Sequence, residues 1–273
     1  MKRGRKPARD TRGKSLGQNF LTDEDILQSI VTSANITPQD TVFEVGAGMG
    51  DLSAILAQKC AQLVTVEVDD HILPFARLRL EGFDNVRVIH GDIRRLHLAE
   101  ILEPLGPFKI VANLPYYLTT ELIEMFMLLP QPVKSVSVMV QKEAGQRVLA
   151  GPGEEGYGPL SILCQVKATP QKALDVPARY FNPPPKVDSM FLHMPMRSTP
   201  PVPQEEQTFF LKTVRAAFSQ RRKTLLNNVM PFFRLERGAA EAVLKACGLP
   251  LNVRAEEMQI SQFLDLSGIL QSQ

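Results

Sequence analysis

The stretch TVFEVGAGMG, residues 41–50, decides the fold. Its first half is a short apolar, β-branched run that is typical of a buried strand, and it leads into Gly46, Gly48 and Gly50. Glycines that follow a strand and precede a helix let the backbone approach a ligand closely. The helical pattern of residues 51–61 comes next, so this region predicts a strand, a ligand-binding turn and a helix. A plain tight turn is the alternative interpretation.

Similar apolar runs recur along the chain, with helical segments between them. This alternation predicts an α/β fold with a parallel sheet that is covered on both faces. Strands are expected at residues 41–46, 63–68, 86–92, 108–113, 133–141 and 187–195, and helices at 51–61, 71–82 and 121–129.

The chain after the last strand has a different composition. Pro195, Pro200, Pro201 and Pro203 indicate a linker, and the residues that follow have helical periodicity with no clear strand. We therefore predict four parts, namely a basic N-terminal arm (1–14), an α/β catalytic domain (15–197), a proline-rich linker (198–203) and a small helical domain (204–273).

The composition of the 273 residues is that of an ordinary globular protein. We find no apolar run long enough to cross a bilayer and no secretory signal, so a cytoplasmic protein is expected. The three cysteines and four histidines show no metal-ligand spacing, and no structural metal is predicted. Nothing in the sequence demands more than a monomer.

Positive charge is concentrated at the N-terminus. Residues 1–14 contain seven Lys/Arg and one Asp, a net charge of +6, whereas the remaining chain has 24 basic and 28 acidic residues, a net charge of −4. A basic block of this kind often contacts nucleic acid, and a solvated tail is the equal alternative.

Two carboxylates follow neighbouring strands of the expected sheet. Glu67 ends the second strand, 21 residues after Gly46, where it can accept hydrogen bonds from both ribose hydroxyls of a nucleoside. Asp92 ends the third strand and can accept from an adenine amino group. A solvated strand end for Glu67 and a helix N-cap for Asp92 are the alternatives. The third glycine, Gly50, comes one residue earlier than in the dinucleotide fingerprint, which favours a nucleoside without a pyrophosphate.

These features at the ends of three successive strands resemble the class I S-adenosylmethionine-dependent methyltransferases. The resemblance implies a Rossmann-like, mostly parallel, seven-stranded sheet and S-adenosylmethionine as the cofactor.

The fourth strand ends in an unusual stretch, Asn113-Leu114-Pro115-Tyr116. The amino group of adenine is a poor nucleophile, so it must be held in line and its hydrogens drawn toward acceptors. The Asn113 side-chain oxygen and the Leu114 carbonyl can supply two acceptors, and Pro115 restricts the direction of that carbonyl. Tyr116 offers a ring on which a flipped base can stack. The alternative interpretation of this stretch is a strand followed by a proline turn, with two tyrosines in the core.

The (N/D)-x-P-Y pattern is shared by methyltransferases of exocyclic base amines, and NLPY resembles the ribosomal RNA adenine dimethyltransferases. By this resemblance LGQNFL, residues 16–21, folds over the cofactor, which makes Asn19 and Leu21 cofactor contacts beside Gly46, Gly48, Glu67, Asp92 and Asn113. FNPPPKVDS, residues 181–189, matches a family loop in which Phe181 faces Tyr116 across the target adenine. Taken without the resemblance, Phe181 is equally well a residue buried in the hydrophobic core.

FSQRRKTLLNN, residues 218–228, is the most discriminating match, because it resembles the branch that modifies small-subunit RNA. Arg221, Arg222 and Lys223 there can contact phosphates, and a solvated charged face is the alternative. The match indicates the ribosomal RNA small-subunit adenine dimethyltransferase A family. Its members dimethylate two adjacent adenosines in the 3′-terminal hairpin loop of 16S-type RNA, with four S-adenosylmethionines, on a partly assembled small subunit.

Two further hypotheses compete with this one. A binding protein for subunit assembly that has lost catalysis is disfavoured by the intact Asn113, Tyr116, Glu67 and Asp92. A dinucleotide oxidoreductase is disfavoured by the glycine spacing and by NLPY. The order in which the adenosines are modified, the assembly state recognised and the role of the arm stay open.

Overall fold

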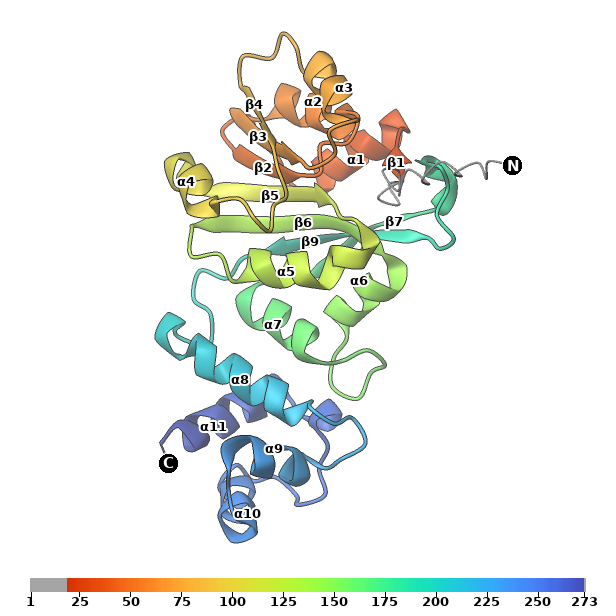
Figure 1. The fold of residues 1–273 in the computed structure, drawn as a ribbon. Helices are drawn as coiled ribbons and strands as arrows, with labels where there is room; N and C mark the ends of the chain where they lie inside the picture. Colours follow the sequence, from red (N-terminus) through yellow and green to blue (C-terminus); the bar gives the residue numbers. More distant parts are fainter. Residues whose placement is uncertain (1–18, 273) are drawn as a thin grey trace, which may run out of the picture.

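The computed structural model describes residues 19–272 and is built around one seven-stranded sheet (Figure 1). The basic arm predicted at residues 1–14, and residues 16–18 of the LGQNFL stretch, lie outside the described residues. The strand order is β4-β3-β2-β5-β6-β9-β7. The bounds are β2 Thr41–Val45, β3 Gln62–Glu67, β4 Val86–His90, β5 Phe108–Asn113, β6 Val133–Gln141, β7 Gln171–Val176 and β9 Ser189–Pro195.

The sheet is mostly parallel, as predicted. The strands β2 to β6 pair in parallel, whereas β9 runs antiparallel to both β6 and β7. Every expected strand is present, with ends that differ by a few residues. Strand β7 was not predicted individually because it is an edge strand that pairs only with β9 and leaves Gln171 and Lys172 exposed.

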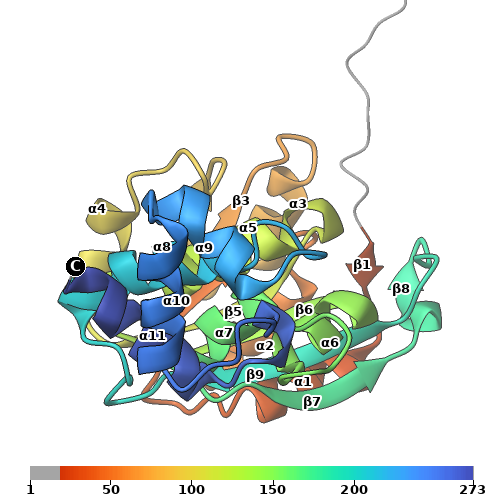
Figure 2. The same ribbon diagram turned by 90° about the horizontal axis from the view of Figure 1, so that it is seen from below.

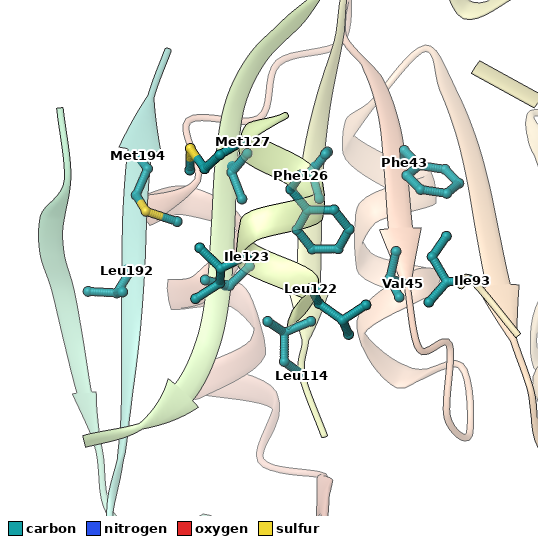
Figure 3. Packing of buried hydrophobic residues seen from close by; sticks show 14 of the residues in the cluster. Phe43, Val45, Ile93, Leu114, Leu122, Ile123, Phe126, Met127, Leu192 and Met194 are labelled. Atoms are coloured by element: carbon teal, nitrogen blue, oxygen red, sulfur yellow. The ribbon is translucent and has the colours of Figure 1, made fainter. Parts of the chain in front are cut away.

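Helices cover both faces of the sheet. One face carries α1 Glu24–Ser33 and α2 Asp51–Lys59, and the other carries α4 Leu98–Leu102, α5 Thr119–Met127, α6 Lys142–Leu149 and α7 Pro159–Lys167. Successive strand residues point to opposite faces, so Val42 packs under α1 and α2 while Phe43 packs in the other cluster. Figure 3 shows that second cluster, in which Leu114 lies beside Leu122 of α5.

The strand order reverses between β2 and β5. From β2 the chain runs outward through β3 and β4, and it then returns to β5 on the other side of β2. Open α/β sheets bind ligands outside the carboxyl ends of the strands at such a switch point. Gly46 follows β2 at this point and Asn113 ends β5, so the two stretches that the sequence singled out meet here.

The described residues after Pro203 are helical, with α8 Gln207–Ala217, α9 Leu225–Phe233, α10 Arg237–Ala246 and α11 Ile260–Gln271. Their apolar core also contains Tyr157, Ile162 and Val166, which precede or belong to α7. The Tyr157 hydroxyl donates to the Met258 carbonyl at 3.0 Å. The C-terminal helices are therefore packed firmly onto the rest of the chain.

Candidate active site

One cavity at the switch point brings the sequence-predicted motifs together. Its wall includes residues of the N-terminal segment, the glycine turn, the end of β3 and the end of β5, namely Asn19, Phe20, Gly46, Gly48, Glu67, Val68, Asn113, Leu114, Pro115, Tyr116 and Tyr117. These residues come from four separate stretches of sequence, and the topology of the sheet is what places them side by side.

The glycine turn has the backbone conformation that glycine permits. Gly46 and Gly48 have φ values of 86° and 56°, where a side chain would be strained. The Gly46 amide donates to the Val66 carbonyl at 2.8 Å, which ties the turn to β3. A Cβ at Gly48 would lie 3.4 Å from the Phe20 ring. The turn is thus held close under the N-terminal segment.

Glu67 is almost fully buried and is held by backbone amides. Its Oε2 accepts from Gly48 at 2.8 Å, and its Oε1 accepts from Val68 at 2.8 Å and from Asp69 at 2.9 Å. A carboxylate offers about four acceptor positions, so about one is left on Oε2. The structure therefore leaves Glu67 room for one further donor, whereas the sequence predicted two ribose hydroxyls.

Asn113 is the last residue of β5, and its amide nitrogen points toward the N-terminal segment. The Nδ2 donates to the Asn19 carbonyl at 3.4 Å, and this assigns the side-chain oxygen as the acceptor end. The Leu114 side chain is buried in the core, and its amide donates to the Met139 carbonyl at 3.1 Å. Pro115 follows with φ −63° and ψ 130°. The backbone of the motif is thus anchored on both sides.

Tyr116 begins a 3₁₀ turn, Tyr116–Leu118, and is partly buried. Its hydroxyl lies 3.1 Å from the Ser189 Oγ at the start of β9. Burial raises the pKa of the Tyr116 hydroxyl, and the Ser189 hydrogen bond opposes that rise. The ring is therefore neutral and fixed at its far end. Neither Phe20 nor Ser189 was singled out from the sequence, although both lie in matched stretches.

The segment that contains Asn19 and Leu21 is fixed by a short ladder. Strand β1, Phe20–Leu21, pairs antiparallel with β8, Phe181–Asn182, with Leu21 opposite Phe181. Both Leu21 and Phe181 are buried in the cluster under α1 and α2. Phe181 is only 4% exposed and is not among the residues that line the Tyr116 cavity. Phe181 therefore packs within the apolar core beside Leu21.

Asp92 is not among the residues that line the cavity. Its carboxylate accepts from the Arg94 guanidinium at 2.9 Å and 2.6 Å. The hydrogen bond from Arg94 lowers the pKa of Asp92. The Asp92 Oδ1 also accepts from the Arg94 amide at 3.0 Å, which is the geometry of the capping alternative.

One buried acid in β2, the strand that precedes the glycine turn, was not singled out from the sequence. Glu44 of β2 is fully buried, and its Oε2 accepts from the hydroxyls of Ser53 and Thr65. Among the described residues, Oε1 has no hydrogen-bond partner. Burial raises the pKa of Glu44 to about 7, the two hydroxyls oppose that rise and nearby Glu67 adds to it. A single acidic residue inside an apolar strand carries no sequence signal that it will be fully buried with a raised pKa.

The basic triplet lies outside the cavity. Arg221, Arg222 and Lys223 are exposed in the loop between α8 and α9, just before Thr224, which caps α9. Figure 1 shows this loop on the same side of the molecule as the carboxyl ends of the parallel strands. In Figure 2, which is seen from below, the C-terminal helices lie in front of the sheet. The two sites therefore share one side of the protein.

The sheet order, the glycine turn and the acid at the end of β3 define a class I methyltransferase fold, as predicted. The model of the ribosomal RNA adenine dimethylase family matches residues 9–272, and the chain belongs to this family.

Curated relatives agree with this assignment. The ribosomal RNA small subunit methyltransferase A of Streptococcus pneumoniae (strain CGSP14) is 40% identical over 95% of this chain and 92% of its own. The protein of the same name from Alkaliphilus oremlandii (strain OhILAs) is 40% identical over 92% of this chain and 88% of its own.

Solved structures share the fold. A dimethyladenosine transferase from Plasmodium falciparum has a TM-score of 0.75 at 25% identity, covering 90% of this chain and 95% of its own. The 23S rRNA methyltransferase ErmE has a TM-score of 0.71 at 23% identity, covering 93% of this chain and 100% of its own.

Family membership confirms the predicted enzyme class and cofactor. The chain is an S-adenosylmethionine-dependent methyltransferase of ribosomal RNA adenine, and the oxidoreductase hypothesis is wrong. Among the described residues, none of the helices has the length and apolar character that a bilayer crossing requires.

Proposed function

We propose that the protein dimethylates the N6 amines of two adjacent adenosines in the 3′-terminal hairpin loop of 16S-type ribosomal RNA. This reaction consumes four S-adenosylmethionines for each RNA. The observation that carries the proposal is the single cavity in which NLPY faces the glycine turn and Glu67. The names of the curated relatives support a small-subunit substrate.

The residues present fit the cofactor. Glu67 keeps one acceptor position for a ribose hydroxyl, and the exposed side chain of Val68 beside it offers an apolar surface to an adenine ring. Gly46 and Gly48 line the cavity without side chains, Asn19 and Leu21 line it from the N-terminal segment, and Asn113 lines it from the end of β5. Asp92 is proposed to accept from the adenine amine, in competition with Arg94.

The cofactor supplies a methyl group on a sulfonium, and this chain positions the nucleophile. The Asn113 Oδ1 and the Leu114 carbonyl accept the two hydrogens of the adenine amine, which turns its lone pair toward the methyl donor. Pro115 and the Leu114 hydrogen bond to Met139 fix that carbonyl. Positioning alone can lower a barrier by about 7–11 kcal/mol. The amine becomes acidic as it is methylated, so its proton can leave to water.

Tyr116 is proposed to stack on the flipped adenine. Its hydroxyl contact with Ser189 keeps the ring in a fixed plane, so the base meets a prepared surface. Phe181 is the proposed second wall. Phe181 pairs with Leu21 of β1, which itself lines the neighbouring part of the site.

The helical part, residues 204–273, is the proposed RNA-binding domain, joined through residues 198–203 to the catalytic domain of residues 15–197. Arg221, Arg222 and Lys223 are exposed, and the loop that contains them lies on the same side of the molecule as the carboxyl ends of the parallel strands (Figure 1). We propose that they contact phosphates of an immature small subunit and that the protein acts as a cytoplasmic monomer.

The test is transfer of labelled methyl groups to small ribosomal subunits that lack the dimethyladenosines, with large subunits as the control. We expect about four methyls on each small subunit, from two adenosines with two methyls each, and none on the large subunit. Label on large-subunit RNA would contradict the proposed substrate. Cofactor binding without any transfer would favour an assembly factor.

A further inference from the structure

Tyr117 is a large aromatic side chain that the proposed reaction does not yet use. It is 63% exposed and nevertheless belongs to the wall of the same cavity as Asn113 and Tyr116. An exposed aromatic ring at the rim of a site for an RNA base is itself a stacking surface. We propose that Tyr117 holds the base next to the target adenosine, so that Tyr116 and Tyr117 receive two neighbouring nucleotides. This inference rests on the proposed function.

The local backbone separates the two rings. Tyr116 and Tyr117 are consecutive residues of a 3₁₀ turn, in which successive side chains point about 120° apart. Tyr116 points toward Ser189 of β9, as its 3.1 Å contact shows. Tyr117 therefore projects from a different side of the turn, where it is exposed to solvent. A strand of RNA that enters the cavity meets one ring inside and the other at the rim.

The charges around Tyr117 favour a base over a phosphate. Arg94 lies within electrostatic range of both Tyr117 and Glu121, and it is paired with Asp92. Arg95 is exposed and lies 3.9 Å from the same Asp92 carboxylate. Both guanidinium groups therefore face the Asp92 carboxylate, and Glu121 places a second negative charge near Arg94. A balanced surface attracts a phosphate weakly, whereas the π face of a base stacks on an aromatic ring without any net charge.

This arrangement suits a substrate with two adjacent target adenosines. While one adenosine is flipped onto Tyr116, its neighbour is also unstacked and needs a partner. Tyr117 supplies that partner, so it lowers the cost of opening the hairpin loop. The ring touches no reacting atom, and we therefore assign it a positioning role.

The experiment compares Tyr117→Ala and Tyr117→Phe with the wild type on small subunits that lack the dimethyladenosines. We expect Tyr117→Ala to raise the KM for the subunit about tenfold, within the range that base–aromatic stacking contributes. Tyr117→Phe keeps the ring and is expected to stay near the wild type. Reverse-transcription stops should also show that more RNA carries only one modified adenosine in the alanine variant.

Two controls separate this role from a structural one. Phe75→Ala removes an aromatic ring that is 54% exposed on helix α3 (Leu73–Arg79) and does not line the cavity, so the KM of this variant should not change. The affinity for S-adenosylhomocysteine should be the same in all variants, as should the Tm. A wild-type KM and a wild-type ratio of modified adenosines in Tyr117→Ala would overturn the inference. If the wild type itself transferred nothing to small subunits, the proposed function would fail and the inference with it.

Discussion

The Glu67 carboxylate accepts a 2.8 Å hydrogen bond from the Gly48 amide, so the end of β3 (Gln62–Glu67) holds the glycine turn that follows β2 (Thr41–Val45). The same carboxylate is proposed to accept a ribose hydroxyl. One side chain thus shapes the turn and contacts the ligand, and the effects of changing it should reflect both roles.

Glu67→Gln is expected to weaken binding of S-adenosylhomocysteine by about 10- to 100-fold. The uncharged amide cannot accept from all three backbone amides, and hydrogen bonds to a charged group contribute about 1.5–3 kcal/mol. Titration calorimetry measures the affinity. Glu81→Gln, on an exposed glutamate outside the cavity, serves as the control. Equal affinities in the two variants would rule out the ligand role of Glu67.

Asn113→Ala is expected to bind S-adenosylhomocysteine within about threefold of the wild type and to lose about 100-fold or more in kcat. The reason is that a preorganised hydrogen-bonding partner for the reacting group is removed, and such partners contribute about 10²–10³ in rate. Single-turnover transfer to small subunits measures the chemical step. Asn113→Asp keeps an acceptor oxygen and should keep measurable transfer. Near-normal turnover in the alanine variant would refute the proposed mechanism.

Glu44→Gln is expected to remove a pH dependence of stability. The pKa of buried Glu44 is about 7 in the folded protein against an ordinary value of 4.5. The folded state therefore holds the proton more tightly, and the free energy of unfolding falls as the pH rises from about 4.5 to about 7. The loss approaches about 3 kcal/mol above pH 7. Urea unfolding at pH 5, 6, 7 and 8 measures it. A slope that is identical in Glu44→Gln would mean that Glu44 does not titrate in this range.

Replacing Arg221, Arg222 and Lys223 with glutamine is expected to weaken binding to small subunits and to flatten its salt dependence. Each phosphate contact that is lost should reduce the slope of log K against log[salt] by about 0.7–0.9. Arg237→Gln with Lys245→Gln, on the exposed face of α10 (Arg237–Ala246), removes positive charge elsewhere on the same helical part and serves as the control for position. An unchanged salt slope in the triple variant would contradict the phosphate contacts and would favour the alternative that the three side chains are a solvated charged face.

The sequence predicted the parts of the fold whose signals are local. Buried parallel strands such as β5 (Phe108–Asn113) are continuous apolar runs, and the turn after β2 carries its own glycines. The meeting of Glu67 with Gly48 could be expected because parallel strands end at one edge of the sheet.

Other features have no local signal. Strands β1 (Phe20–Leu21) and β8 (Phe181–Asn182) have two residues each and are too short to show a hydrophobic period. They pair with each other although most of the α/β sequence lies between them. Phe181 is buried by that pairing, and Asp92 is drawn to Arg94, two residues away. Long-range packing and local ion pairing therefore decided where these two side chains lie, and the motifs alone did not.

The apolar core that Tyr157, Ile162 and Val166 share with the C-terminal helices has a consequence for substrate choice. It sets a constant span between the basic loop before α9 (Leu225–Phe233) and the cavity at Asn113. A fixed distance of this kind selects among substrates by their three-dimensional shape. An RNA that is anchored at the loop reaches the cavity only if its own fold places the target adenosines at the matching distance, so methylation would record that this part of the RNA has folded.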